Sequence, residues 1–143
     1  MVAEESPYEF SADPGRIDPA RVYALLAEHA YWVADRSREV QDAAIAGSRN
    51  YAVYARESGT LVGYARVVTD GATFAWLADV VVDPAHRRRG LARLLVEGIT
   101  GDLDRLGVAR TLLRASSEGR ALYEDLGWKP VDEPDAWMAR YRI

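Results

Sequence analysis

The sequence contains no cysteine, and histidine occurs only twice, at His29 and His86. The lack of thiols excludes disulfides, thiolate metal sites and a cysteine acyl-enzyme, and two histidines are too few for a histidine-rich metal cluster. The longest apolar run, from residue 72 to residue 82, is interrupted by Asp79 and is too short to span a bilayer. Basic residues are not in excess either: 18 Lys and Arg stand against 22 Asp and Glu, for a net charge of -4. We therefore expect no metal site, no membrane segment and no nucleic-acid partner.

The residues that are present suit a soluble globular protein. Hydrophobic residues make up 49% of the chain and charged residues 28%. A length of 143 residues fits a single domain over the whole chain, residues 1–143. Residues 1–7 are acidic and lack the apolar centre of a secretory signal, so the expected compartment is the cytoplasm.

The spacing of apolar residues predicts a mixed α/β fold. Strands are expected at residues 8–11, 51–55, 61–69, 73–82 and 111–115. Helices are expected after the capping residues Asp18 and Ser37, from Gly90 to Gly107, and over residues 120–126. A last segment is expected to start at residues 128–130, and residues 137–143 are expected to close the sheet. The predicted architecture is a central twisted mixed sheet of about six to seven strands flanked by about four helices.

Residues 77–92, LADVVVDPAHRRRGLA, are the most informative segment. They predict a buried strand, a turn at Pro84, and a glycine at the start of an amphipathic helix. Such a helix start presents unpaired N–H groups and the positive end of a dipole, which together favour a bound phosphate. The three arginines at 87–89 favour a pyrophosphate, although a solvated helix start without ligand is the simpler alternative. Gly-x-x-x-x-Gly-Lys-Ser/Thr and Gly-x-Gly-x-x-Gly are both absent, which argues against the common nucleotide-binding loops.

Two motifs resemble the GNAT family of N-acetyltransferases. The acyl-CoA signature of that family, Gln/Arg-x-x-Gly-x-Gly/Ala, is similar to residues 87–92, Arg-Arg-Arg-Gly-Leu-Ala. A second family motif, Ala-x-x-Leu-Tyr-x-x-x-Gly-Phe/Trp, is similar to residues 120–128, Arg-Ala-Leu-Tyr-Glu-Asp-Leu-Gly-Trp. The motifs follow each other in the family's order, each after a predicted strand and at a predicted helix.

The resemblance implies that the strand ending at Val82 and the parallel strand at 111–115 splay apart, with acetyl-CoA in the gap. The pantetheine arm would pair with the strand edge, and the pyrophosphate would lie on the loop amides, where Gly90 permits close approach because it has no Cβ. The implied cofactor-binding residues are Val80, Val81, Val82, Arg87, Arg88, Arg89, Gly90, Leu91, Ala92, Arg93, Ser116, Ser117 and Tyr123. Tyr123 would also protonate the departing thiolate; the alternative is an aromatic side chain that only packs.

Asp79 stands out because it is the charged residue of an apolar strand. A carboxylate in that position must be paired, hydrogen-bonded or neutral. One interpretation is a structural ion pair with a residue of the neighbouring strand such as Arg66. The other is a catalytic base that takes the proton of the incoming amine, directly or through water. Many relatives carry a glutamate near this point, which this chain lacks, so bulk water is a further alternative.

Two groups of residues have less specific signals. Tyr31, Trp32 and Arg36 lie between the first two helices, a region that commonly walls the acceptor site in this fold. Together with Arg66 they are the predicted substrate residues, with ordinary helix packing as the alternative. Ser116 and Ser117 stand where many relatives have an asparagine that contacts the pantetheine, and the alternative for them is a cap on the last short helix.

The function predicted from the sequence is direct acetyl transfer from acetyl-CoA to a primary amine of a small molecule or peptide, without a metal. The thioester oxygen would be held by a backbone N–H near Val81. One alternative is a non-catalytic acyl-CoA-binding or sensor module on the same fold. Another is a nucleic-acid or peptide-interaction domain centred on residues 87–93, which the acidic balance disfavours. By analogy, a homodimer is expected.

Overall fold

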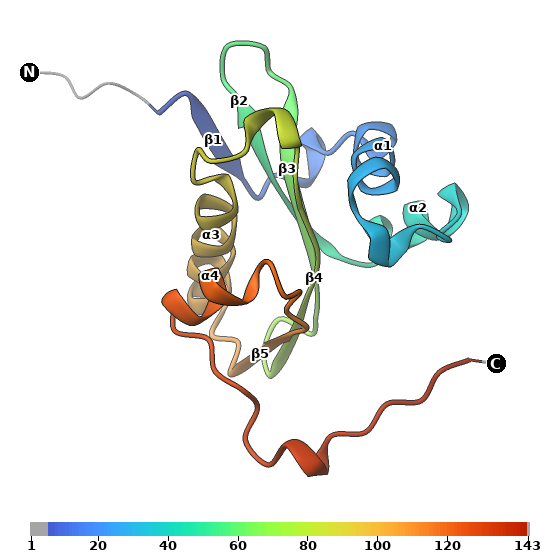
Figure 1. Cartoon of the computed structure of the whole chain (residues 1–143), viewed down its shortest axis with the longest axis vertical. Helices are drawn as coiled ribbons and strands as arrows, with labels where there is room; N and C mark the ends of the chain where they lie inside the picture. Colours follow the sequence, from blue (N-terminus) through green and yellow to red (C-terminus); the bar gives the residue numbers. More distant parts are fainter. Residues whose placement is uncertain (1–5, 143) are drawn as a thin grey trace, which may run out of the picture.

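Five strands form one mixed sheet in the computed structural model, which describes residues 6–142 (Figure 1). The strands lie in chain order, β1 (Tyr8–Ser11), β2 (Arg49–Ala55), β3 (Leu61–Thr69), β4 (Phe74–Val82) and β5 (Arg110–Leu113). The pairs from β1 to β4 are antiparallel, and β4 and β5 are parallel. On one side of the sheet lie α1 (Pro19–His29) and α2 (Arg38–Ala46), and on the other lie α3 (Leu91–Leu106) and α4 (Arg120–Asp125). The predicted mixed fold with four helices is confirmed, and no helix within residues 6–142 is long and apolar enough to cross a membrane.

The first two helices begin at the predicted caps. The Asp18 side chain accepts hydrogen bonds from the backbone N–H groups of Ala20 and Arg21, and Ser37 Oγ accepts one from Val40 N–H at 3.1 Å. These bonds satisfy amides that have no partner within a helix. The inner face of α1 is buried against the sheet through Val22, Leu25 and Leu26.

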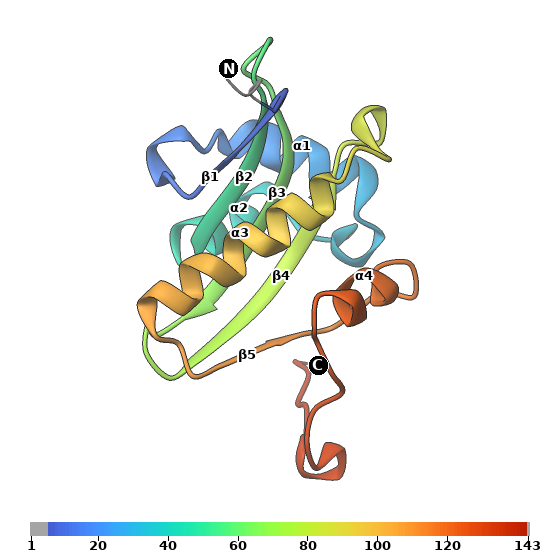
Figure 2. The same ribbon diagram turned by 90° about the vertical axis from the view of Figure 1, so that its left-hand side faces the viewer.

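The main core lies between α3 and the opposite face of the sheet. Figure 2 shows α3 running across the strands. Its apolar residues recur every three to four positions, so they form one face that packs on β2, β3 and β4. The residues of α3 in this core are Leu91, Leu95, Ile99 and Leu103. Gly107 ends the helix in the left-handed conformation, with φ of 78°.

Gly98 of α3 faces the Phe10 ring of β1 at close range. A Cβ at this position would lie 2.6 Å from two carbon atoms of the Phe10 ring, which stacks on the buried Tyr51 ring. We expect Gly98→Ala to reduce the free energy of unfolding in urea by about 1–2 kcal/mol, because the overpacking exceeds the gain in helix propensity. Gly101→Ala is the control: its Cβ would be 3.6 Å from the nearest atom, and it should stabilise by about 0.5 kcal/mol. Equal stabilisation by both substitutions would contradict this packing account.

A β-bulge at Asp79 changes which way β4 presents its side chains. Tyr64 pairs with Val81 and Arg66 with Ala78, so one residue of β3 opposes two of β4, and Asp79 has φ of 59°. In a regular strand, residues four apart share a face. Here Leu77 packs in the core under α3 and Val81 in the core under α1.

Beyond the bulge, β4 and β5 part. Their pairing ends at Leu77 with Leu113, whereas β4 continues to Val82. The five residues from 78 to 82 therefore have no strand beside them on the β5 side within the described chain. The predicted splay between these two parallel strands is present.

The prediction that residues 137–143 close the sheet is wrong for residues 137–142, which belong to a C-terminal segment, residues 128–142. This segment contains one turn of 3-10 helix at Pro134–Ala136 and no strand, and it runs away from the sheet beyond β5 (Figure 1). Pro130 and Pro134 have no N–H to donate to a ladder, and Trp137 instead packs 5.1 Å from the Arg110 guanidinium. The sheet therefore has five strands rather than six to seven. Residue 143, the last of the predicted strand, is outside the described residues.

Candidate functional site

A cavity of about 460 Å³ opens where β4 and β5 part. It brings together residues that the sequence suggested for different tasks. The predicted acceptor residues that line it are Tyr31, Trp32, Arg36 and Arg66. The predicted cofactor residues that line it are Val80, Ser116, Ser117 and Tyr123, and Asp79 lines it as well. One cleft thus brings together the residues that the sequence analysis predicted for the acceptor and for the cofactor.

Other predicted cofactor residues lie outside this cavity. Val81 packs under α1, Val82 packs on the α3 side, and residues 87–93 form the loop and the first turn of α3. The sequence analysis missed several lining residues, and the two with large polar or aromatic side chains are Trp76 and Arg114. Trp76 could have been found by its position two residues before Ala78 on the same face of the strand, and Arg114 by its position directly after β5, at the carboxyl end of a parallel strand.

The loop before α3 exposes a row of backbone donors. Arg88 and Gly90 both have left-handed backbones, with φ of 63° and 74°. Gly90 is the N-cap of α3 and supplies no capping side chain, and the N–H groups of residues 88–93 donate to no atom of residues 6–142. A Cβ at Gly90 would meet nothing within 4 Å, so the space above the glycine is open. These features fit a bound pyrophosphate, which needs several convergent N–H donors and close backbone approach.

The arginines of this loop differ in their contacts. Arg89 donates from Nη1 to Tyr8 Oη at 2.7 Å, and Tyr8 Oη in turn lies 2.7 Å from His86 Nδ1. Arg93 pairs with Asp125 of α4, which joins the start of α3 to α4. Arg87 and Arg88 form no ion pair with any of residues 6–142. Both therefore remain available to an anionic ligand.

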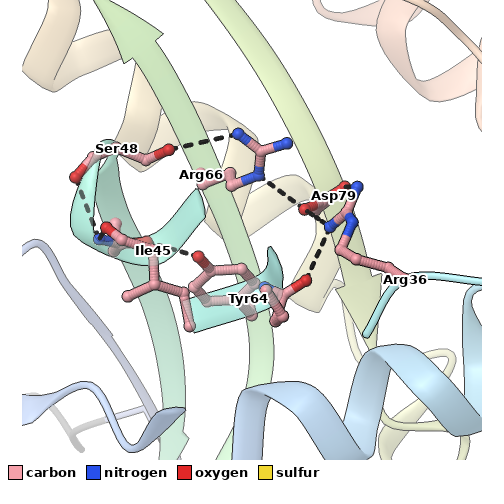
Figure 3. A network of polar contacts seen from close by, with 8 residues as sticks. Arg36, Ile45, Ser48, Tyr64, Arg66 and Asp79 are labelled. Carbon is pink, nitrogen blue, oxygen red and sulfur yellow. Dashed lines mark hydrogen bonds and ion pairs between the residues drawn. The ribbon is translucent and has the colours of Figure 1, made fainter. Parts of the chain in front are cut away.

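Asp79 lies between two arginines at the floor of the cavity (Figure 3). Arg36 Nη1 donates to Asp79 Oδ2 at 2.6 Å and Arg66 Nε donates to the same oxygen at 2.7 Å. The pair with Arg66 was one of the two interpretations of Asp79, and it is present; Arg36 is a second partner. Burial by itself raises the pKa of the Asp79 carboxyl, but the hydrogen bonds and charges of the two arginines outweigh burial and leave the pKa below its usual value.

Residues behind the arginines hold them in place. Arg36 also donates to Gln41 Oε1 at 2.7 Å, and Arg66 Nη1 donates to Ser48 Oγ at 3.3 Å (Figure 3). Gln41 is buried, and its Nε2 makes no hydrogen bond within the described residues. No pattern in the sequence marks Gln41 or Ser48 as supports of this site, because the contacts join segments that only the fold brings together.

Tyr123 lines the same cavity from α4. Its ring meets Trp128 edge to face at 6.0 Å, and its hydroxyl makes no hydrogen bond to residues 6–142. Burial raises the pKa of the Tyr123 phenol, so the group stays protonated at neutral pH. Ser116 lines the same cavity, accepts a hydrogen bond from Gly119 N–H at 3.0 Å and so stabilises the turn before α4.

The comparison with known proteins fits this geometry. The sequence pattern of the acetyltransferase (GNAT) domain matches residues 20–137. The chain belongs to the GNAT family. The crystal structure of a GNAT-family protein from Xanthomonas campestris pv. campestris superposes with a TM-score of 0.85 at 31% identity, covering 94% of this chain and 93% of that one.

Two further GNAT relatives are informative. The ribosomal protein bS18-alanine N-acetyltransferase of Escherichia coli (strain K12) is 40% identical over 77 residues, 50% of each chain, so this GNAT chain spans about half the length of that curated relative. A GNAT acetyltransferase from Elizabethkingia anophelis, solved with acetyl-CoA bound, has a TM-score of 0.68 at 16% identity and covers 90% of this chain and 80% of that one. The second likeness concerns the fold alone.

Proposed function

We propose that this GNAT chain is an acetyl-CoA-dependent N-acetyltransferase that transfers the acetyl group directly to a primary amine of a small molecule or peptide. The row of free N–H groups at residues 88–93, next to the splayed end of β4, carries the proposal. The amide row suits the pyrophosphate, and the unpaired edge of β4 suits the amides of the pantetheine arm, through Val80 and Val82. The bS18-alanine relative supports an amine as acceptor, and a place in the cytoplasm is part of the proposal. The expected homodimer remains a prediction.

Each residue of the cleft has a task in this proposal. Acetyl-CoA supplies an acetyl group on a thioester. The backbone N–H near Val81 holds the thioester oxygen, where negative charge develops as the amine attacks. Tyr123 donates its phenolic proton to the departing sulfur, and Ser116 and Ser117 lie beside the arm of the cofactor. No cysteine is needed, because the amine attacks the thioester directly.

In this proposal Asp79 positions the arginines, and water removes the proton of the amine. The Asp79 carboxylate already accepts hydrogen bonds from Arg36 and Arg66, and its pKa is lowered, which makes it a poor proton acceptor near pH 7. The cavity is open to solvent on one side, so water can reach the amine. Asp79 is therefore a positioning residue here rather than the base.

The cofactor part of the proposal can be tested at Gly90. Gly90 and Gly107 flank the same helix with φ of 74° and 78°, and a Cβ at either would meet nothing within 4 Å. Alanine at each should cost similar backbone strain, about 1 kcal/mol. We expect Gly90→Ala to weaken acetyl-CoA binding by about 10-fold or more, because its Cβ reaches the space of the pyrophosphate, and Gly107→Ala to leave binding unchanged. Isothermal titration measures both, and equal affinities of the two variants would contradict the proposed site.

A further inference from the structure

The arginine cluster at the floor of the cavity has more positive charge than the protein neutralises. Asp79 is the carboxylate partner of both Arg36 and Arg66, and the side chains of the three are only 3%, 19% and 15% exposed in that order. Their other partners, Gln41 and Ser48, are neutral. Two largely buried cations thus share one anion, an arrangement that is costly unless a further negative charge is supplied.

The arginines also retain donors. Arg66 Nη2 and Arg36 Nε make no hydrogen bond to any atom of residues 6–142. Arg114, on the opposite wall, is exposed and forms no ion pair within the described residues. The cavity is thus lined by three arginines and a single carboxylate. Guanidinium groups with free N–H donors bind carboxylates and phosphates in preference to neutral groups.

The phosphates of the cofactor do not account for this charge. The free amides and the arginines of residues 87–93 do not line the cavity, and they already provide an anion site at the start of α3. Arg36 and Arg66 belong instead to the side of the sheet that carries α1 and α2: Arg36 precedes α2, and Arg66 hydrogen-bonds to Ser48, which follows α2. Their unmatched charge therefore faces the space left for the acceptor.

Building on the proposed function, we infer that the acceptor is a small amine with a carboxylate or phosphate a few bonds from the amino group. The anion binds to Arg66, Arg36 and Arg114. It lies near the amine because Asp79, the partner of Arg66 and Arg36, is only two residues from Val81, near which the proposed function places the thioester oxygen. Trp32 and Trp76 line the same cavity and suit an apolar body between the two groups. A free amino acid has this pattern, whereas a peptide N-terminus has a neutral amide in place of the carboxylate.

The direct test compares amines that differ in the anion alone. Two matched pairs are used, L-phenylalanine with L-phenylalaninamide and phosphoethanolamine with ethanolamine, together with a peptide amide that begins with alanine. For each substrate, turnover is measured as free thiol released from acetyl-CoA. We expect kcat/KM for the anionic member of at least one pair to exceed that of its neutral partner by about 10- to 100-fold, the effect of one charged hydrogen-bonding group. A preference within the first pair indicates a carboxylate on the acceptor, and a preference within the second pair indicates a phosphate. Equal or better turnover of the neutral amines or of the peptide would overturn the inference and leave the proposed function intact.

Variants and a binding measurement complete the test. Arg114→Gln should reduce the preference for the anionic amine several-fold. Arg105→Gln removes the same charge at the far end of α3, where the side chain is 73% exposed, and should not change the preference. Affinity for the same amines, read from tryptophan fluorescence with coenzyme A bound, should show the same preference. If the anionic amines bind in preference to the neutral ones but no thiol is released, the proposed function fails and the inference stands. If the anionic amines are preferred neither in turnover nor in affinity, the inference fails.

Discussion

Tyr123→Phe is expected to lower kcat about 100-fold while KM for acetyl-CoA changes less than about 3-fold. The substitution removes one oxygen from a ring that keeps its edge-to-face contact with Trp128, so the fold and the cofactor site should remain. The large effect follows from the proton that the departing sulfur needs, since the Tyr123 hydroxyl has no other hydrogen-bond partner within the described residues. Steady-state kinetics with free-thiol detection give both constants.

The matched control is Tyr141→Phe, which makes the same change at an exposed position in the C-terminal segment. It should leave both constants unchanged.

Because burial raises the pKa of Tyr123, the phenol should remain an effective proton donor up to at least about pH 10, which is the ordinary pKa of tyrosine. If Tyr123→Phe retains full kcat, Tyr123 only packs. If the wild type binds acetyl-CoA but acetylates no amine in a broad panel, the chain is a binding module on this fold.

The second large effect is expected for stability: Asp79→Asn should reduce the free energy of unfolding by about 2–3 kcal/mol. The substitution leaves Arg36 and Arg66 without their shared charge in a setting where both are largely buried. Asparagine keeps the shape of the side chain and tolerates the left-handed backbone at this position, where φ is 59°, so the loss reports on charge. Urea unfolding at pH 7 measures it.

An exposed ion pair provides the control for this experiment. Asp42→Asn breaks the pair with Arg38. The two side chains of this pair, Asp42 and Arg38, are 46% and 47% exposed, and the substitution should cost less than about 0.5 kcal/mol.

The effect of Asp79 on the free energy of unfolding also depends on pH. Its pKa is lower in the folded protein than in the unfolded chain, so its contribution is full above about pH 5 and is lost as the pH falls through the folded value. The gap between wild type and Asp79→Asn should therefore narrow below about pH 4; a gap that widens there would contradict the ion-pair account.

The elements with strong local signals were predictable from the sequence. Asp18 and Ser37 cap the helices they were expected to cap, β1 and β3 have their predicted bounds, and Gly90 marks the start of α3. Each of these depends on a few neighbouring residues, either a side chain that bonds to the next turn or an apolar face with a fixed period. The prediction that was wrong is the closing strand at residues 137–143. Whether such a strand forms depends on pairing with β5, which the local pattern of residues does not determine.

Many of the residues that line the candidate site were predictable from the sequence, but the ion pairs and hydrogen bonds between them were not. Tyr31, Trp32, Arg36, Arg66 and Tyr123 were each suggested by position, and all five line one cavity. The sequence alone offered Arg66 as a partner for Asp79 but not Arg36, which is 43 residues away and reaches Asp79 only because the bulge in β4 lies opposite the α1–α2 connection. The bulge itself depends on register, because a single extra residue on one strand leaves no mark in the pattern of apolar residues.

Amide NMR shows whether the main-chain N–H groups at the start of α3 bind a diphosphate. The ¹⁵N-labelled protein would be titrated with coenzyme A and, separately, with pantetheine, which lacks the diphosphate. We predict that coenzyme A shifts the amide signals of residues 88–92 strongly, whereas pantetheine shifts those around Val80 and leaves residues 88–92 unchanged. Signals of residues 88–92 that stay in place at saturating coenzyme A would contradict the account.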